Sequence, residues 1–284
     1  MHIFREIGPM KAYLKRERSS LSTIGLVPTM GALHAGHMSL LHASKKENTI
    51  TVCSIYVNPT QFNNLIDLEK YPRTLDKDIQ MLAATECDAV FCPDNSMMYP
   101  VVSQLKFDFG TLDKILEGEF RPGHYSGVAL VVSKLFNIIQ PDRAYFGQKD
   151  FQQCRVISRL VEEMKFDLSL VCAPIVREAD GLAMSSRNVR LSDADRKRAV
   201  FLFQSLKQTR DRLLQGESFS QLRKTVASQF DLNNVKLEYL ALADRENLTL
   251  LDNITNPSRA ILLIAAHVGD VRLIDNLFLT ENSN

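Results

Sequence analysis

Short apolar segments typical of strands alternate with helix-patterned segments between residues 24 and 176 of this chain. Strands are expected at residues 24–30, 50–57, 88–92, 143–146 and 168–176. Helices with apolar side chains at every third or fourth position are expected at residues 36–46, 74–87, 128–139 and 151–164. Such alternation predicts a parallel sheet with helices on both faces, which is a Rossmann-like α/β fold.

The pattern changes after about residue 180. Ser192 and Asp195 form a start typical of a helix that ends at Gly216, and a second helix follows at 219–230. Strands are expected at residues 235–239, 260–266 and 271–278. We therefore expect two domains: residues 1–177, which bind the ligands, and residues 178–284, a smaller α+β domain.

Charge and cysteine content limit the possible partners. The 284 residues include 34 basic and 33 acidic side chains, a balance that argues against binding to nucleic acid. Five scattered cysteines lack metal or disulfide spacing, so we expect reduced core residues. The first twenty residues lack the apolar run of a signal peptide, and no segment is long enough to cross a membrane. A cytoplasmic protein is expected.

Ligands of parallel sheets bind beyond the carboxyl ends of the strands. The turn after the first predicted strand, residues 28–37, contains His34 and His37 around Gly36. A helix that begins there offers free backbone N–H groups for an anion, and both imidazoles can donate to a phosphate. The alternatives for the histidines are helix caps, or a metal pair for which no third ligand is spaced suitably.

Two more strand ends carry polar side chains. Asn58 and Gln61 follow the second strand, where amides suit a small molecule with hydroxyl or carboxylate groups, although an ordinary Asn-Pro turn is the better explanation of this segment taken alone. Lys149 and Gln153 follow the fourth strand, with Asp150 placed to cap the next helix. A solvated lysine beside a capped helix is the alternative there.

The fourth segment, residues 181–188, contains two serines and Arg187 on a glycine-led loop near the predicted domain boundary. It can close over phosphates, or it is a polar linker. Neither the dinucleotide-binding pattern Gly-x-Gly-x-x-Gly nor the P-loop pattern occurs in the chain. The four segments would meet one ligand if they converge at the sheet edge.

At these segments the chain resembles the pantothenate synthetase (pantoate–β-alanine ligase) family, nucleotidyltransferases that share a fold with class I aminoacyl-tRNA synthetases. Matching motifs occur in order along nearly the whole chain: PTMGALHAGH at 28–37, VNPTQF at 57–62, YPRT at 71–74, RPGHYSGV at 121–128, KLFNIIQPD at 134–142, FGQKDFQQ at 146–153, DGLAMSSRN at 180–188 and RLIDN at 272–276. Two departures are small: Ala35 stands where many members have Glu, and residues 63–68 are more apolar than usual.

The resemblance implies that pantoate attacks ATP to form pantoyl adenylate, which β-alanine then converts to pantothenate and AMP. It also implies Mg²⁺ as cofactor and a homodimer. His34, His37, Lys149 and Arg187 would be the catalytic residues. Gln61 and Gln153 would hold pantoate, and Gln61 would also meet β-alanine. The ATP site would comprise Met30, Gly31, Ala32, Leu33, His34, Ala35, Gly36, His37, Gly147, Gln148, Lys149, Asp150, Val176, Met184, Ser185, Ser186 and Arg187.

The same resemblance implies a role for each of the two domains. Residues 1–177 would bind nucleotide and pantoate, and residues 178–284 would act as a lid. Asp76 and Asp78 are possible Mg²⁺ ligands, although ATP can hold the ion mostly by itself. The alternatives are another nucleotidyltransferase of this fold, or a nucleotide-binding module without catalysis.

Overall fold

The computed structural model describes residues 1–280, which form two compact units. The first comprises Met1–Gly147 and Gln152–Pro174, and the second comprises Gln148–Phe151 and the chain from Ile175 onward. A short turn between the two parts of the first unit therefore belongs, by its contacts, to the second.

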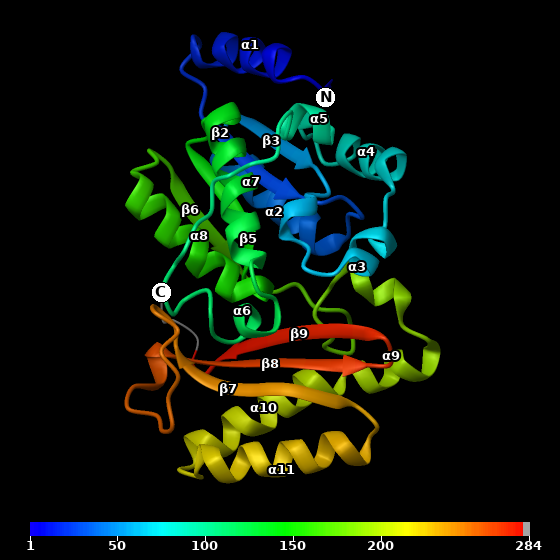
Figure 1. The fold of residues 1–284 in the computed structure, drawn as a ribbon, viewed down its shortest axis with the longest axis vertical. Helices are drawn as coiled ribbons and strands as arrows, with labels where there is room; N and C mark the ends of the chain where they lie inside the picture. The colour runs from blue at the N-terminus through cyan, green and yellow to red at the C-terminus, as the bar shows by residue number, and fades with distance from the viewer. Residues whose placement is uncertain (281–284) are drawn as a thin grey trace. The chain divides into compact units, whose positions relative to one another are not determined.

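The first unit is built on a sheet whose strands are all parallel (Figure 1). Its strands are β1 (His2–Phe4), β2 (Ile24–Thr29), β3 (Ile50–Ile55), β4 (Ala89–Phe91), β5 (Arg143–Gly147) and β6 (Ser169–Ala173). Its helices are α1 (Ile7–Arg18), α2 (Ala35–Glu47), η1 (Pro59–Gln61), α3 (Leu65–Lys70), α4 (Leu75–Ala83), α5 (Asn95–Met98), α6 (Glu117–Phe120), α7 (His124–Ile139) and α8 (Phe151–Met164). The fold class predicted for this part of the chain is confirmed.

The strand order locates the place where a ligand would bind. Among the described residues the order is β1-β4-β3-β2-β5-β6, so the chain leaves β2 toward one edge and later returns to β5 on the other side. That reversal between β2 and β5 is the topological switch point of the sheet. Ligands of such sheets bind outside the carboxyl ends of the strands at this point.

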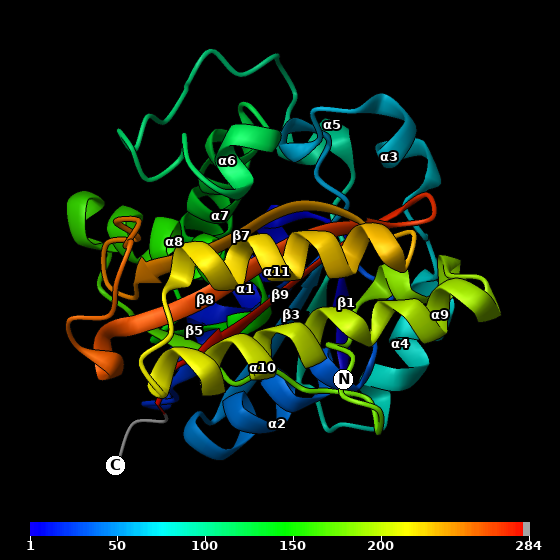
Figure 2. The ribbon, with the colours of Figure 1, turned by 90° about the horizontal axis from the view of Figure 1, so that it is seen from below.

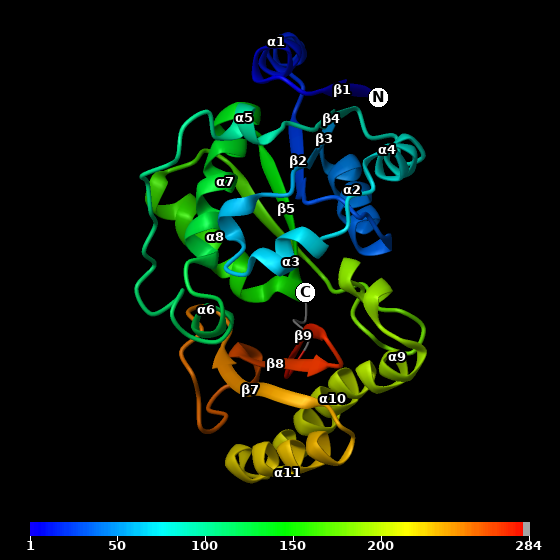
Figure 3. The ribbon, with the colours of Figure 1, turned by 45° about the vertical axis from the view of Figure 1, so that its right-hand side comes forward.

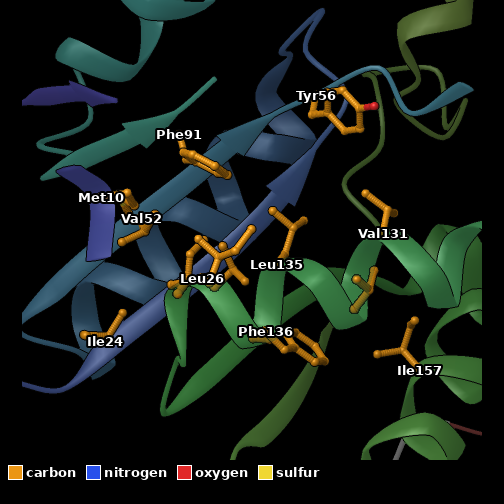
Figure 4. Close-up of a cluster of buried hydrophobic side chains, with 14 of the residues drawn as sticks. Met10, Ile24, Leu26, Val52, Tyr56, Phe91, Val131, Leu135, Phe136 and Ile157 are labelled. Carbon is orange, nitrogen blue, oxygen red and sulfur yellow. The ribbon is translucent and has the colours of Figure 1, made fainter. Parts of the chain in front are cut away.

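Alternating side chains of the strands bury two apolar layers. Leu26, Val52 and Ala144 face the layer that contains α1, α7 and α8, where Leu135 and Phe136 of α7 lie close to Leu26 (Figure 4). Their neighbours in sequence, among them Val27 and Cys53, face α2 and α4 on the other side (Figure 3). Because helices cover both faces of this parallel sheet, nearly every residue along its strands must be apolar.

The second unit is an antiparallel sheet covered by helices. Its elements are η2 (Gln148–Asp150), η3 (Ser186–Arg190), α9 (Asp193–Ala199), α10 (Phe201–Leu214), α11 (Phe219–Leu232), β7 (Lys236–Asp244), η4 (Pro257–Arg259), β8 (Ala260–Val268) and β9 (Val271–Phe278). The sheet order is β7-β8-β9, and α10 and α11 lie side by side against one face (Figure 2). Leu206, Phe230 and Leu262 are completely buried between them. The predicted α+β architecture is confirmed.

Several expected boundaries were wrong. The helix expected at 74–87 ends at Ala83, because Glu86 adopts a left-handed backbone conformation with φ +57°. Thr74 does not cap it through its side chain. The helix expected at 192–216 is divided at Val200 into α9 and α10, although Val200 keeps an α-helical backbone conformation with φ −59° and ψ −26°. Ser192 does cap α9 as expected, accepting the N–H of Asp195.

Two further features differ from expectation. The first twenty residues, for which no element was predicted, contain β1 and α1. The missed signal was the helical spacing of Met10, Tyr13 and Leu14, all of which are buried. Cys172 is exposed and is not a core residue, because it lies on the edge strand β6. Within residues 1–280, no helix is long and apolar enough to cross a membrane.

Candidate active site

The turn after β2 is held in an unusual backbone conformation by one buried carboxylate. Gly31 and Ala32 both have positive φ, +79° and +50°, which is uncommon for alanine. The N–H of Ala32 donates to Oδ2 of Asp78 at 2.9 Å, and the N–H of Leu33 donates to Oδ1 at 2.8 Å. Asp78 is 1% exposed. The carboxylate thus fixes the direction in which the turn enters α2.

His34 and His37 cap the helix that follows this turn. Nδ1 of His34 accepts the N–H of Gly36 at 3.2 Å, and Nδ1 of His37 accepts the N–H of His34 at 3.3 Å. The ring centroids are 4.0 Å apart. Because each Nδ1 accepts a hydrogen bond, the proton of each neutral ring lies on Nε2. The capping alternative is therefore correct as a description of the local structure, and in each neutral ring Nε2 is the nitrogen that carries the proton.

Gln61, at the end of the loop after β3, lies beside the β2 turn. It is buried, its Nε2 donates to Sδ of Met30 at 3.1 Å, and its Oε1 accepts from Nδ2 of Asn58 at 3.0 Å. The structure therefore brings Gln61 and Met30, both predicted site residues, into contact. Asn58 is an equally buried member of this group, and Oδ1 of Asn58 accepts from the hydroxyl of Tyr99 at 2.9 Å.

Helix α7 supports this loop through residues for which the sequence predicted no role. Nδ1 of His124 donates to the carbonyl of Gln61 at 2.8 Å, because Nε2 of His124 already accepts from Arg121 at 3.1 Å. The carbonyl of Gly127 accepts from Nδ2 of Asn58 at 3.2 Å. The available signal was the family motif at 121–128, which contains all three of these α7-side residues.

The turn after β5 carries Lys149. Asn276 on β9 donates from Nδ2 to the carbonyls of Gln148 and Lys149, at 2.9 and 3.0 Å. Nζ of Lys149 lies 3.7 Å from Oδ1 of Asp150, and the Lys149 side chain is 17% exposed. Asp150 ends the 3₁₀ turn η2, and α8 begins at Phe151.

Gln153 lies in the first turn of α8 and is partly buried. Its neighbour Gln152 has a structural task instead. Its amide Nε2 donates to the carbonyls of Leu112 and Ile115, both at 2.8 Å, and its Oε1 accepts the N–H of Glu117. Gln152 thus holds the backbone at residues 112–117.

The predicted phosphate loop begins as a hairpin. The N–H of Met184 donates to the carbonyl of Val176 at 3.0 Å, so these two predicted site residues are paired, and Ser185 caps the 3₁₀ turn that contains Arg187. Gly181 turns the hairpin with φ +96°, and an added Cβ would lie 2.6 Å from the ring of Phe203.

Three ion pairs, made by two arginines, secure this hairpin. Arg196 donates to Glu178 and to Asp180, both at 2.6 Å, and its bond lowers the pKa of the Asp180 carboxyl. Arg177 forms a bidentate pair with Asp275, whose pKa is raised by burial even though the guanidinium opposes that shift. These ion pairs thus hold the N-terminal part of the hairpin, residues 177–180.

The possible Mg²⁺ ligands do not form an ion site. Both oxygens of Asp78 accept backbone N–H groups, and Asp76 is exposed on α4. Among residues 1–280 there is no group of three or more His, Cys, Asp or Glu side chains that could hold a metal ion. Asp78 therefore fits a structural role and does not fit the role of a metal ligand.

Comparison with known proteins gives one consistent result. Residues 2–278 match the protein family described as pantoate-beta-alanine ligase. Pantothenate synthetase from Bacteroides fragilis (strain YCH46) is 44% identical over 283 residues, which cover 99% of this chain and 100% of that protein. Pantothenate synthetase from Thermosipho africanus is 45% identical over 280 residues, 98% of this chain and 100% of that protein.

Solved structures are similar over the same extent. The crystal structure of pantothenate synthetase from Thermus thermophilus has a TM-score of 0.91 at 38% identity, covering 99% of this chain and 100% of that one. Pantoate-beta-alanine ligase from Francisella tularensis, complexed with beta-gamma ATP and beta-alanine, has a TM-score of 0.83 at 35% identity and covers 98% of each chain.

Proposed function

Because the chain belongs to the pantoate-beta-alanine ligase family, we propose that it joins pantoate to β-alanine through a pantoyl-adenylate intermediate. It is an ATP-dependent ligase that forms an amide bond. In the first half-step, a carboxylate oxygen of pantoate attacks the α-phosphorus of ATP and pyrophosphate leaves. In the second, the amine of β-alanine attacks the acyl carbon, AMP leaves, and the amine loses a proton.

The phosphates would be bound by cationic and N–H donors. The two Nε2–H groups of His34 and His37 are suited to donate to phosphate oxygens as negative charge develops. Lys149 and Arg187 would add positive charge, while the backbone of residues 30–37, 147–150 and 184–187, together with Val176, would enclose the nucleotide. Adenylation needs in-line placement and charge stabilisation more than covalent participation by the protein.

Pantoate would be held by amides. Gln61 is buried in η1, after β3, and a side-chain amide can donate to a carboxylate and accept from a hydroxyl. Gln153 would be the second contact, and Gln61 would also meet β-alanine. The bond from His124 to the Gln61 carbonyl supports this role, because it orients the backbone from which the amide projects.

The proposal also assigns roles to the two predicted domains, to Mg²⁺ and to the oligomer. Residues 1–177 would bind nucleotide and pantoate, and residues 178–284 would close over the adenylate, which hydrolyses readily in water. Mg²⁺ would arrive bound to the ATP phosphates, since the nearby carboxylates do not form an ion site. The active protein would be a cytoplasmic homodimer.

The observation that carries this proposal is the contact between Met30 of the β2 turn and Gln61 after β3, beyond the carboxyl ends of two adjacent strands. This contact supports the proposal because Met30 belongs to the segment expected to bind nucleotide and Gln61 is the amide expected to bind pantoate. Exchange of labelled pyrophosphate into ATP tests it directly. Exchange should require Mg²⁺ and pantoate and should proceed without β-alanine.

Other results of that assay identify the alternatives. Exchange that runs without pantoate, or that needs β-alanine, would contradict an adenylate formed in the first half-step. ATP binding without exchange would indicate a nucleotide-binding module. Exchange supported by another acceptor in place of pantoate would indicate a different nucleotidyltransferase of the same fold.

A further inference from the structure

Asp275 and Asn276 lie within the family motif at 272–276, yet the proposed chemistry gives them no task. Both are buried on β9, 4% and 2% exposed. We propose that they are positioning residues that hold two nucleotide-binding segments of the second unit, the turn at 148–150 and the hairpin at 176–184, in one geometry. This inference rests on the proposed function, because it assumes that those segments bind ATP.

Asn276 holds the turn through three hydrogen bonds of its side chain. Nδ2 donates to the carbonyls of Gln148 and Lys149, at 2.9 and 3.0 Å, and Oδ1 accepts from Nε2 of Gln148 at 3.1 Å. Two consecutive carbonyls are thereby fixed by one amide. Since these carbonyls flank the Cα of Lys149, the bonds set the direction in which the lysine side chain leaves the backbone.

Asp275 holds the hairpin through Arg177. Oδ2 and Oδ1 of Asp275 accept from the two guanidinium nitrogens at 2.6 and 2.9 Å. The same guanidinium donates to the carbonyl of Gly181 at 3.1 Å, and its carbon lies 3.7 Å from the centre of the Phe203 ring. Arg177 is therefore clamped on three sides, and it carries the hairpin in which Val176 pairs with Met184.

The contacts made by Asp275 and those made by Asn276 are linked to each other by hydrogen bonds. The N–H of Asn276 donates to Oδ1 of Asp275 at 2.7 Å, and the carbonyl of Asn276 accepts from Arg177 at 3.2 Å. Both residues lie in the paired region of β9, opposite Ile264 and Leu263 of β8. Groups placed by a paired strand are held more narrowly than groups on a free loop. Lys149 and the Val176–Met184 pair thus share one rigid support.

A positioning residue must act through the residue it places, which gives a test by double substitution. Asn276→Ala should lower the rate of pantoate-dependent pyrophosphate exchange about tenfold to a hundredfold, because small misplacements of a charge-stabilising group have effects of that size. In a Lys149→Ala background the same change should cost less than about threefold. Asn256→Ala, which removes an exposed cap distant in sequence from both segments, is the control and should leave exchange unchanged.

The outcomes separate cleanly. A folded Asn276→Ala protein with full exchange, or with an equal loss in both backgrounds, would overturn the proposal. If Asn276→Ala does not fold, the isosteric Asn276→Asp variant, which places a carboxylate opposite two carbonyls, is measured in its place. If neither variant folds, the role of Asn276 is purely structural and the proposal is overturned. If the wild-type protein shows no pantoate-dependent exchange, the proposed function is wrong. The ATP affinities of the same variants and of the wild-type protein are then compared by calorimetry. Equal affinities would contradict the positioning role.

Discussion

The carboxylate of Asp78 on α4 accepts the backbone N–H of Leu33 at 2.8 Å, which connects two segments 45 residues apart. Its other oxygen accepts the N–H of Ala32, and the hydroxyl of Thr74 lies 3.2 Å from both oxygens. Gly31 passes so close that an added Cβ would lie 3.0 Å from Oδ2. The position of the His34–His37 pair therefore depends on a residue of a different helix.

Asp78→Asn should disturb this turn. An amide nitrogen would face a backbone N–H, so one buried donor loses its partner, and we expect the free energy of unfolding to fall by about 1–3 kcal/mol. Pyrophosphate exchange should fall with it. Asp76→Asn, an exposed change on the same helix, should alter neither quantity. A variant of normal stability that needs more Mg²⁺ would instead make Asp78 a metal ligand.

His37→Ala should lower kcat by a factor of about 10²–10³, since it removes a donor to a phosphate that gains charge in the transition state. It should also destabilise α2 by about 1 kcal/mol, because Nδ1 of His37 completes the helix cap. His42→Ala, an exposed histidine of the same helix, is the control. Unchanged turnover with lowered stability would leave His37 with the capping role alone.

Substitutions of Lys149 and of Gln153 should affect different kinetic quantities. Lys149→Ala removes a charge that stabilises the transition state, so it should lower the adenylation rate strongly. Gln153→Ala should raise the KM for pantoate by the equivalent of about 1–3 kcal/mol and leave ATP affinity nearly intact. Calorimetry with ATP and steady-state kinetics with pantoate measure both, with the exposed Lys46→Ala as control. Loss of ATP binding in Gln153→Ala would disprove this assignment.

Gly127→Ala should displace the loop that carries Gln61. An added Cβ on α7 would lie 2.1 Å from the carbonyl oxygen of Thr60 and 2.7 Å from the N of Gln61, both backbone atoms. We expect a loss of about 1–3 kcal/mol in unfolding free energy and a higher KM for pantoate. Gly8→Ala meets nothing within 4 Å and should stabilise α1 by about 0.4–1 kcal/mol. Equal stabilisation by both changes would mean that α7 can shift without cost.

Local patterns were enough to predict much of the fold. The alternation of apolar strands and amphipathic helices predicted the parallel sheet, since both periodicities come from neighbouring residues. The cap at Ser192 could be predicted for the same reason. The interruption at Val200 could not, because apolar periodicity continues across it: Ala199, Leu202 and Leu206 are all buried. Glu86, the left-handed residue that follows α4, belongs to a residue type with no preference for that conformation.

The candidate site divides in the same way. The sequence by itself determined that His34, Gln61 and Lys149 follow strands, and motif resemblance supplied their expected roles. Tertiary structure alone decided which groups hold them: Asp78 at the β2 turn, and Asn276, 128 residues from Gln148, at the β5 turn. Such bonds join segments that only the order of strands and helices brings together. Local propensity acts over a few residues, whereas the direction of a buried donor is set by whatever partner the completed fold places beside it.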